Sequence, residues 1–259
     1  MFETESRPGA RRFRFSASLA HLDRVVAETI DFLRDSQAPG NLFEVKLLLR
    51  EALLNAVIHG SRQDPRYLVT LDALAGDDRL TLSVTDQGPG FNWRAGLNQP
   101  ASPEAESGRG LTIMSLYADA VCYNAAGNEV TLTKTVRGLR GPSIAPDQAG
   151  SNTTRSASMQ DIRFEDGHTI LTPAGDIVAS VTDDLRTRLK DIMAEHPGPL
   201  VIDLARVELI DSVGIGLLIA AHNTLAKTGG RLALTNVNAD LASLLRTMRL
   251  DKHFSIQTV

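Results

Sequence analysis

Residues 44–60, EVKLLLREALLNAVIHG, constrain the fold more than any other stretch of the chain. Their periodicity predicts a helix that is apolar on almost every side, with Glu51 and Asn55 one turn apart on one stripe. Lys46 and Arg50 fall on another face, where we expect water to reach them. A carboxylate and an amide among leucines need partners, because unpaired burial costs roughly 1–3 kcal/mol per group. Backbone, a buried water or a ligand can supply those partners.

Composition excludes several classes of protein. The net charge of −4 provides no broad basic field for nucleic acid or anionic lipid. Cys122 is the only cysteine, which rules out an internal disulfide and fits a reducing compartment. The N-terminus has no apolar core of a secretory signal, and no apolar run is long enough to span a bilayer. We therefore expect a cytoplasmic protein without direct nucleic-acid or membrane partners.

The first half of the chain alternates helices and strands. The N-terminal residues, with Arg7 and Arg11, are expected to form a solvated tail that leads into a strand, and a basic docking arm is the alternative. Ser18 is the expected cap of a helix to about residue 33, and Asn41 with Glu44 forms an N-cap signature for the central helix. The other expected elements are strands at 11–16, 67–74, 79–85, 119–124 and 128–136, and a helix at 108–118.

The second half is a separate globular segment. Residues 137–158 are small, polar and rich in Pro and Gly, which predicts a flexible tether. Beyond it we expect strands at 161–164, 168–173, 199–204, 231–235 and 254–256, and helices at 181–195, 212–227 and 239–248. This alternation predicts an α/β layer with a partly parallel sheet. The length of 259 residues also favours two domains.

Three polar patches in the first half predict a nucleotide site together. They are Glu51 with Asn55, the segment 86–90 (DQGPG) after a strand, and the segment 108–110 (GRG) at the start of a helix. Taken alone, the three patches have ordinary structural explanations, which are, in the same order, a buried polar pair, a turn and a flexible start of a helix. Together they offer Asp86 to an exocyclic amine, backbone N–H groups to phosphate, and an amide oxygen to Mg²⁺.

The three patches match known sequence motifs. ExxxN, DxGxG and GxG resemble the N, G1 and G2 boxes of the GHKL ATPase superfamily, and EALLNAVIHG with GRGLTIMSLYAD resembles the anti-sigma-factor serine kinases over residues 11–137. The resemblance implies a Bergerat-type ATP-binding α/β sandwich. By it, Glu51 is the catalytic base and Asn55 the magnesium ligand. The residues implied to bind ATP are Asn55, Asp86, Gly88, Gly90, Gly108, Arg109 and Gly110.

One position departs from the pattern of these kinases. Many relatives carry a basic residue just before the G2 box, where this chain has Glu106. By the resemblance, Arg109 is the candidate to contact phosphate in its place. Without such a contact, nucleotide binding survives while phosphoryl transfer is slow.

A serine in the second half is the candidate acceptor of phosphate. The segment IDLARVELIDSVGIGLLIAAH leads from an apolar strand into a turn and a helix, with Ser212 as the expected N-cap and Asp211 favouring the helix dipole. Residues 159–259 resemble the STAS domain of anti-anti-sigma factors, a mixed-sheet α/β fold in which a hydroxyl of this turn is phosphorylated. Some members use a second adjacent hydroxyl, but that place holds Val213 here.

The resemblances imply an ATP- and Mg²⁺-dependent partner switch in bacterial transcription regulation and stress response. They divide the chain into a kinase domain at 1–137, a linker at 138–158 and a STAS domain at 159–259. The kinase domain would phosphorylate Ser212 or a serine of a partner. The implied partners are a sigma factor or a STAS-domain anti-anti-sigma protein, and a phosphatase that resets the switch. The resemblance also implies that the kinase domain could form a homodimer. A non-catalytic ATP-gated scaffold remains open. The ATP-binding half of a histidine kinase is disfavoured, because no helix pair with a phosphoacceptor histidine precedes it.

Overall fold

The computed structural model describes residues 1–35, 41–76, 78–94, 108–136, 161–165, 167–196 and 198–258. These residues form two compact units, an N-terminal unit that ends at residue 136 and a C-terminal unit that begins at residue 161. The predicted linker, 138–158, lies outside the described residues, so its bounds stay a prediction. Among the helices that the structure describes, none has the length and apolar character needed to cross a membrane.

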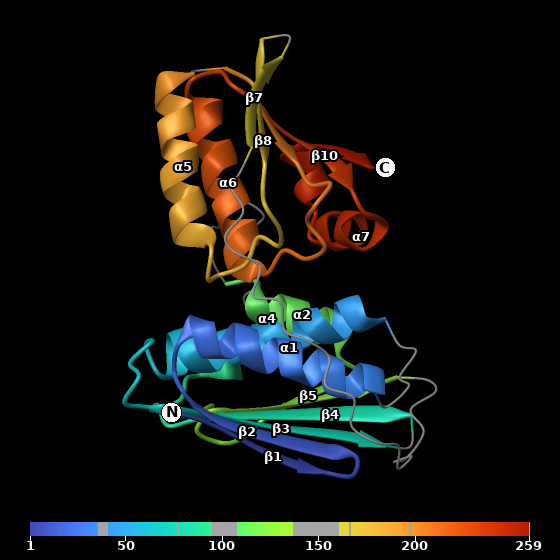
Figure 1. Cartoon of the computed structure of the whole chain (residues 1–259). Coiled ribbons are helices and arrows are strands. Elements are labelled where there is room, and N and C mark those ends of the chain that lie inside the picture. The colour runs from blue at the N-terminus through green and yellow to red at the C-terminus, as the bar shows by residue number, and fades with distance from the viewer. Residues whose placement is uncertain are drawn as a thin grey trace. The chain divides into compact units, whose positions relative to one another are not determined.

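The N-terminal unit is built on an antiparallel sheet in the order β1-β2-β3-β4-β6-β5 (Figure 1). Every neighbouring pair in it is antiparallel. Apolar and polar residues alternate along the strands, so that one face is buried and the other is exposed to solvent. The strands are β1 (Phe2–Arg7), β2 (Ala10–Ser16), β3 (Leu68–Gly76), β4 (Arg79–Asp86), β5 (Ala120–Tyr123) and β6 (Glu129–Thr135).

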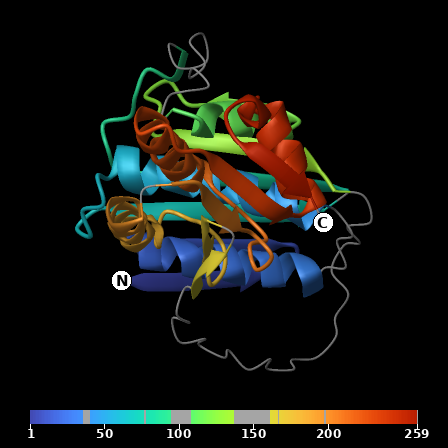
Figure 2. The same cartoon turned by 90° about the horizontal axis from the view of Figure 1, so that it is seen from above.

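Helices cover the buried face of this sheet. They are α1 (Leu19–Asp35), α2 (Leu42–Leu54) and α4 (Gly110–Tyr117), and both views show α1 and α2 running roughly along the strands (Figures 1 and 2). Asn41 caps α2, because its side-chain oxygen accepts a hydrogen bond from the Phe43 N–H, as the sequence predicts. Lys134 of β6 ties the layers together, since its Nζ lies 2.5 Å from Glu44 of α2 and donates to the Tyr117 carbonyl of α4.

The first strand corrects the sequence prediction. Residues expected to form a solvated tail form β1, which pairs along its whole length with β2, from Phe2 opposite Phe15 to Arg7 opposite Ala10. The prediction was wrong because polar residues dominate this strand, whose side chains are mostly exposed. Phe2 anchors it by packing against Phe15 and under the Arg24 guanidinium, 3.9 Å from the ring centroid.

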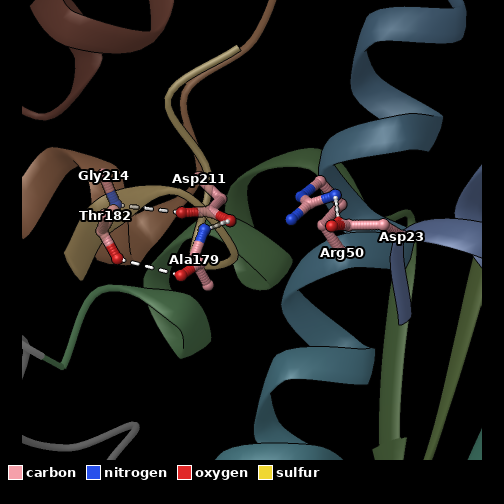
Figure 3. A network of polar contacts seen from close by, with 6 residues as sticks. All are labelled: Asp23, Arg50, Ala179, Thr182, Asp211 and Gly214. Carbon is pink, nitrogen blue, oxygen red and sulfur yellow. Dashed lines mark hydrogen bonds and ion pairs between the residues drawn. The ribbon is translucent and has the colours of Figure 1, made fainter. Parts of the chain in front are cut away.

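The central helix is also different from the prediction. It is not one α-helix to Gly60, because α2 ends at Leu54 and a π-helical segment, η1, spans Asn55–Gly60. Such π-turns are rare and occur frequently at functional sites. Arg50, expected to contact water, is only 4% exposed, and its Nη1 lies 2.7 Å from the Asp23 carboxylate of α1 (Figure 3).

The C-terminal unit has a sheet in the order β11-β10-β9-β8-β7. Its neighbours are parallel except for β7 and β8, which are antiparallel, so the mixed α/β fold predicted from the sequence is confirmed. Two of its helices, α5 and α6, lie side by side (Figure 1). The elements are β7 (Asp161–Glu165), β8 (His168–Thr172), α5 (Thr182–Glu195), β9 (Leu200–Asp203), α6 (Ser212–Lys227), β10 (Leu232–Val237), α7 (Ala239–Thr247), η2 (Leu250–Lys252) and β11 (Ser255–Thr258).

Candidate functional site

The N-terminus of α4 meets two polar side chains of the α2–η1 segment. A Cβ atom added at Gly110 would lie 2.8 Å from Glu51 Oε2 and 3.5 Å from Asn55 Oδ1. Glycine is therefore the residue that lets the helix terminus come this close. Glu51, Asn55 and Gly110, which the sequence predicted as parts of one site, therefore lie close together, although Gly110 is more than fifty residues from the other two.

The polar atoms at this junction have the character of a binding site. Glu51 is fully buried, whereas Asn55 is partly exposed. The Asn55 Nδ2 atom is buried and has no hydrogen-bond partner among the residues that the structure describes. Leaving such a group unpaired costs free energy, so a bound ligand that pairs with the amide would recover it. The first N–H groups of α4 have no partners within the helix and attract anions.

Asp86 lies at the end of β4 in close contact with two glycines. Its carboxylate accepts a hydrogen bond of 2.7 Å from the Gly88 N–H. A Cβ atom at Gly60 would lie 2.3 Å from the carboxylate carbon, so η1 and β4 approach each other only because position 60 is glycine. Burial raises the pKa of Asp86 above its ordinary value, and the Gly88 N–H lowers it in part.

The glycines of the DQGPG segment make close contacts with protein backbone. A Cβ atom at Gly88 would lie 2.1 Å from the Gly60 carbonyl oxygen. Gly90 has a φ of +75° and would place a Cβ atom 1.9 Å from the Ala126 carbonyl oxygen. The two glycines therefore allow this segment to pack closely against the end of η1 and the loop at Ala126.

A pocket opens between α2, η1 and the ends of β4, β5 and β6. Asn55 and Asp86 line it together, which the sequence predicted as separate contacts of one ligand. Asn128 fixes one rim, because its Nδ2 donates to the Asp86 carbonyl and its Oδ1 accepts from Asn124. The other lining residues are Ala52, Ala56, His59, Gly60, Val84, Gly90, Phe91, Tyr123, Gly127, Glu129 and Val130.

Two residues of the pocket were not identified as binding residues from the sequence. His59 follows Asn55 on η1, and burial lowers the pKa of its imidazole. Tyr123, on β5, stacks on Trp93 with ring centroids 5.1 Å apart. Trp93 also donates from its indole N–H to the Asn124 carbonyl, so it packs as an anchor. Only the alternation along β5 could have indicated that Tyr123 faces the pocket.

The G2-like segment is described only in part. Gly108 has a φ of +86°, the left-handed region that glycine adopts without strain, and Arg109 precedes α4 with an exposure of 3%. A side chain so buried reaches a phosphate only if it moves. Glu106 and the remainder of the predicted lid, 95–107, lie outside the described residues.

In the C-terminal unit, Asp211 organises the predicted phosphorylation turn. Its carboxylate is fully buried and accepts hydrogen bonds of 2.9 Å from the N–H groups of Gly214 and Ala179 (Figure 3). Thr182 supports the same loop by donating its hydroxyl to the Ala179 carbonyl. A Cβ atom at Gly214 would lie 2.1 Å from the Ile177 carbonyl oxygen, so glycine is required there.

The cap of α6 corrects the sequence prediction. Asp211, with extended backbone, is the N-cap, and Ser212 is the first residue of the helix. The prediction was wrong because serine and aspartate are both good caps, and only the loop around Ala179 selects the aspartate. Ser212 is partly exposed at the N-terminus of a sixteen-residue helix, where added negative charge is favourable.

The two units thus define a two-domain α/β protein with a partly polar pocket in the first and an aspartate-capped serine turn in the second. Comparison with known families gives the same division. Residues 15–134 match the model of the histidine kinase-like ATPase domain, and residues 159–259 match the STAS domain.

Curated relatives match the N-terminal part of the chain. An anti-sigma F factor of Clostridium perfringens (strain SM101 / Type A) is 30% identical over 127 residues, which cover 48% of this chain and 81% of the relative. One from Anoxybacillus flavithermus (strain DSM 21510 / WK1) is 33% identical, covering 38% and 70%. The chain spans 64% of the anti-sigma F factor of Geobacillus stearothermophilus, at 36% identity over 35% of this chain. The chain therefore belongs to the histidine kinase-like ATPase family, with a STAS domain at its C-terminal end.

Solved structures match the C-terminal part. A putative anti-sigma factor antagonist from Thermotoga maritima covers 40% of this chain and 89% of its own length, with 21% identity and a TM-score of 0.37. At that score the likeness adds nothing to the assignment, which rests on the family models.

Replacement of Asp211 tests the organisation of the serine turn. We expect Asp211→Ala to lower the free energy of unfolding of the C-terminal unit by about 2–4 kcal/mol, because the helix loses its cap and the Ala179 N–H loses its acceptor. Asp240→Ala, at an exposed position in the first turn of α7, is the matched control. Circular dichroism of the full chain in urea measures the change. Equal stability of the two variants would contradict this role of Asp211.

Proposed function

We propose that the chain is an ATP-dependent partner-switching regulator, in which an anti-sigma-type serine kinase domain phosphorylates a STAS-domain serine. The kinase domain is residues 1–137, the linker 138–158 and the STAS domain 159–259. The observation that carries the proposal is the approach of Gly110 to Glu51 and Asn55. It supports the proposal because the N-terminus of a helix, whose N–H groups favour phosphate, lies beside a carboxylate and an amide, which phosphoryl transfer can use.

The pocket residues have separate roles in this proposal. Asp86 accepts a hydrogen bond from the exocyclic amine of adenine, and the N-terminus of α4, from Gly108 to Gly110, receives the phosphates. Gly88 and Gly90 keep the loops around the base in place, and Arg109 is a second phosphate contact once it moves. The carbonyl oxygen of Asn55 is the protein ligand of Mg²⁺.

The donor set around Asn55 fits magnesium. Mg²⁺ is commonly bound by few protein oxygens and keeps water and phosphate oxygens as its other ligands. The described residues contain no cluster of three or more His, Cys, Asp or Glu side chains for a metal, so a single amide oxygen agrees with a phosphate-held ion. When bound, Mg²⁺ supplies positive charge that offsets the charge on the phosphates.

Glu51 is the proposed base for the transfer. Its carboxylate accepts the proton of the serine hydroxyl as the oxygen bonds to the γ-phosphorus, and the bond from that phosphorus to the ADP oxygen breaks. The products are ADP and phosphoserine. Ser212 is the proposed acceptor within this chain, and the equivalent serine of a separate STAS protein is the alternative acceptor.

Phosphorylation of Ser212 would switch binding without refolding the domain. The phosphate adds roughly −1.5 to −2 charges at the N-terminus of α6, where the helix dipole tolerates it. A partner surface that carries carboxylates would be repelled. The proposed partners are a sigma factor and a STAS-domain anti-anti-sigma protein, with a phosphatase to reset the switch and a homodimer formed through the kinase domain.

Two observations favour a second candidate function, a non-catalytic scaffold gated by ATP. Glu51 has no exposed surface, so a protein hydroxyl reaches it only after a rearrangement. Val213 beside Ser212 also leaves one hydroxyl fewer than some related turns carry. In this candidate, nucleotide sets the conformation of the pocket loops, and the STAS domain is a docking module that stays unmodified.

Mass spectrometry after incubation with Mg-ATP separates the two functions. We expect phosphate on Ser212 of the wild-type chain and a transfer rate about 10²–10⁴-fold lower in Glu51→Ala, since the base is lost. Glu28→Ala, a change on α1 away from the pocket, and Ser243→Ala, an exposed serine on α7, are the matched controls. Nucleotide binding with no phosphate on Ser212 or on an added STAS-domain protein would instead favour the scaffold.

A mixture of two inactive chains tells whether transfer occurs within or between chains. Glu51→Ala keeps the acceptor and lacks the base, whereas Ser212→Ala keeps the base and lacks the acceptor. Phosphate on the Glu51→Ala chain in the mixture demonstrates transfer between chains. Its absence there, together with activity of the wild-type chain, demonstrates transfer within one chain.

The raised pKa of Asp86 predicts a pH dependence of nucleotide binding. The ionised carboxylate accepts from the amine, so ADP affinity should fall as the pH drops, with a midpoint above the ordinary Asp value of 3.8. In the protein without nucleotide the sign is opposite. Burial disfavours the charged form, so the stability contributed by Asp86 is present at low pH and declines as the pH rises through its pKa.

Calorimetric titration with Mg-ADP from neutral pH down to about pH 4, close to the ordinary Asp value, measures this dependence. Asp86→Asn should bind more weakly at neutral pH and show a flatter profile. His59→Asn should keep the profile, which separates the Asp86 carboxylate from the imidazole of the pocket. A wild-type profile identical to that of Asp86→Asn would refute the role of this carboxylate.

A further inference from the structure

One row of side chains across the N-terminal sheet ends in a tyrosine. The residues paired along this row are Phe13, Leu71, Val84, Val130 and Tyr123, one from each of five neighbouring strands. The first four are at most 5% exposed. Residues directly opposite in an antiparallel ladder share a face, so Tyr123 points from the edge strand toward the side that the helices cover.

The hydroxyl of Tyr123 is not explained by packing. It is buried and has no hydrogen-bond partner among the described residues. An unpaired buried hydroxyl destabilises a fold, and a phenylalanine would fill the same space without that cost. The oxygen therefore needs a partner that the described chain does not contain.

The surroundings of Tyr123 fix where that partner must lie. Its ring is held by the stacked Trp93 and by the edge of Phe91, whose ring centroid is 5.7 Å away. It lines the same pocket as Asp86 and Asn55. Burial raises the pKa of Tyr123 far above the physiological range, so the phenol stays protonated and can donate.

The strand geometry gives the separation of Asp86 and Tyr123. Tyr123 lies two strands from Val84, which is about 10 Å, and Asp86 lies two residues beyond Val84 on β4, which is about 7 Å. The two backbone positions are therefore about 12 Å apart. A planar base that is hydrogen-bonded at both ends has the size to bridge that separation. The pocket has a volume of about 30 Å³ in this structure, so it has to widen to admit the base.

We propose that the Tyr123 hydroxyl donates a hydrogen bond to a ring nitrogen of the adenine held by Asp86, and that Tyr123 is a specificity-determining residue of this site. The inference rests on the proposed nucleotide function and adds a second point of recognition. Adenine offers an amine donor to Asp86 and ring-nitrogen acceptors to Tyr123. Hypoxanthine and guanine carry an oxygen in place of that amine, so the carboxylate of Asp86 rejects them, and Tyr123 rejects them as well where its acceptor is the ring nitrogen beside the amine.

Binding of Mg-ADP and its deaza analogues to the full chain tests the inference. We expect Tyr123→Phe to weaken ADP binding about 5- to 30-fold, the usual effect of losing one buried hydrogen bond. Of 1-deaza-, 3-deaza- and 7-deaza-ADP, one should bind the wild type more weakly by a similar factor. With that analogue, Tyr123→Phe should cause no further loss, because the acceptor is already gone.

Controls separate recognition from folding. Tyr67→Phe changes an exposed tyrosine outside the pocket and should leave all affinities unchanged. The melting temperature of Tyr123→Phe without nucleotide should equal or exceed that of the wild type, because an unpaired hydroxyl is removed. If this variant fails to fold, the analogue series on the wild type decides, and equal affinity for ADP and all three analogues overturns the inference.

The remaining outcomes are also decisive. Unchanged ADP affinity in Tyr123→Phe, or an equal loss for ADP and all three analogues, overturns the inference while the nucleotide function stands. No binding of ADP by the wild type would overturn the proposed function and this inference together.

Discussion

The close approach of Gly110 to Glu51 and Asn55 is the contact on which the proposed nucleotide site depends. It brings the positive end of a helix dipole to a carboxylate and an amide, and no larger residue would permit it without displacing a side chain. Gly60, at the end of η1, has the same function, because it lets η1 approach the carboxylate of Asp86 closely. At both positions a side chain that could pack in the core is absent, and backbone lies next to a carboxylate instead. Such an arrangement is typical of a binding site and unusual in a core.

A second buried carboxylate governs the other unit. Asp211 satisfies two backbone N–H groups from segments more than thirty residues apart, and so fixes the loop around Ala179 to the start of α6. Ser212 is thereby held on a rigid turn at a helix N-terminus. A phosphate added there would change the charge of the surface and leave its shape in place, which is what a reversible switch of binding requires.

Much of this organisation follows from the sequence, because periodicity reports which face of an element is buried. Helix and strand positions in both units agree with it, and so does the mixed sheet of the C-terminal unit. The errors have a common origin in tertiary contacts. Strand β1 exists through its pairing with β2, and the choice of Asp211 as the cap depends on a loop far away in sequence. The π-turn at Asn55 likewise carries no signal in local composition.

Calorimetric titration of the full chain with Mg-ATP, beside an Asn55→Ala variant, tests the central claim most directly. The account predicts a saturable heat for the wild type, and little or none for the variant, because the amide that orients metal and phosphate is removed. Absence of heat in the wild type, or equal binding by both proteins, would contradict a nucleotide site between α2, η1 and α4.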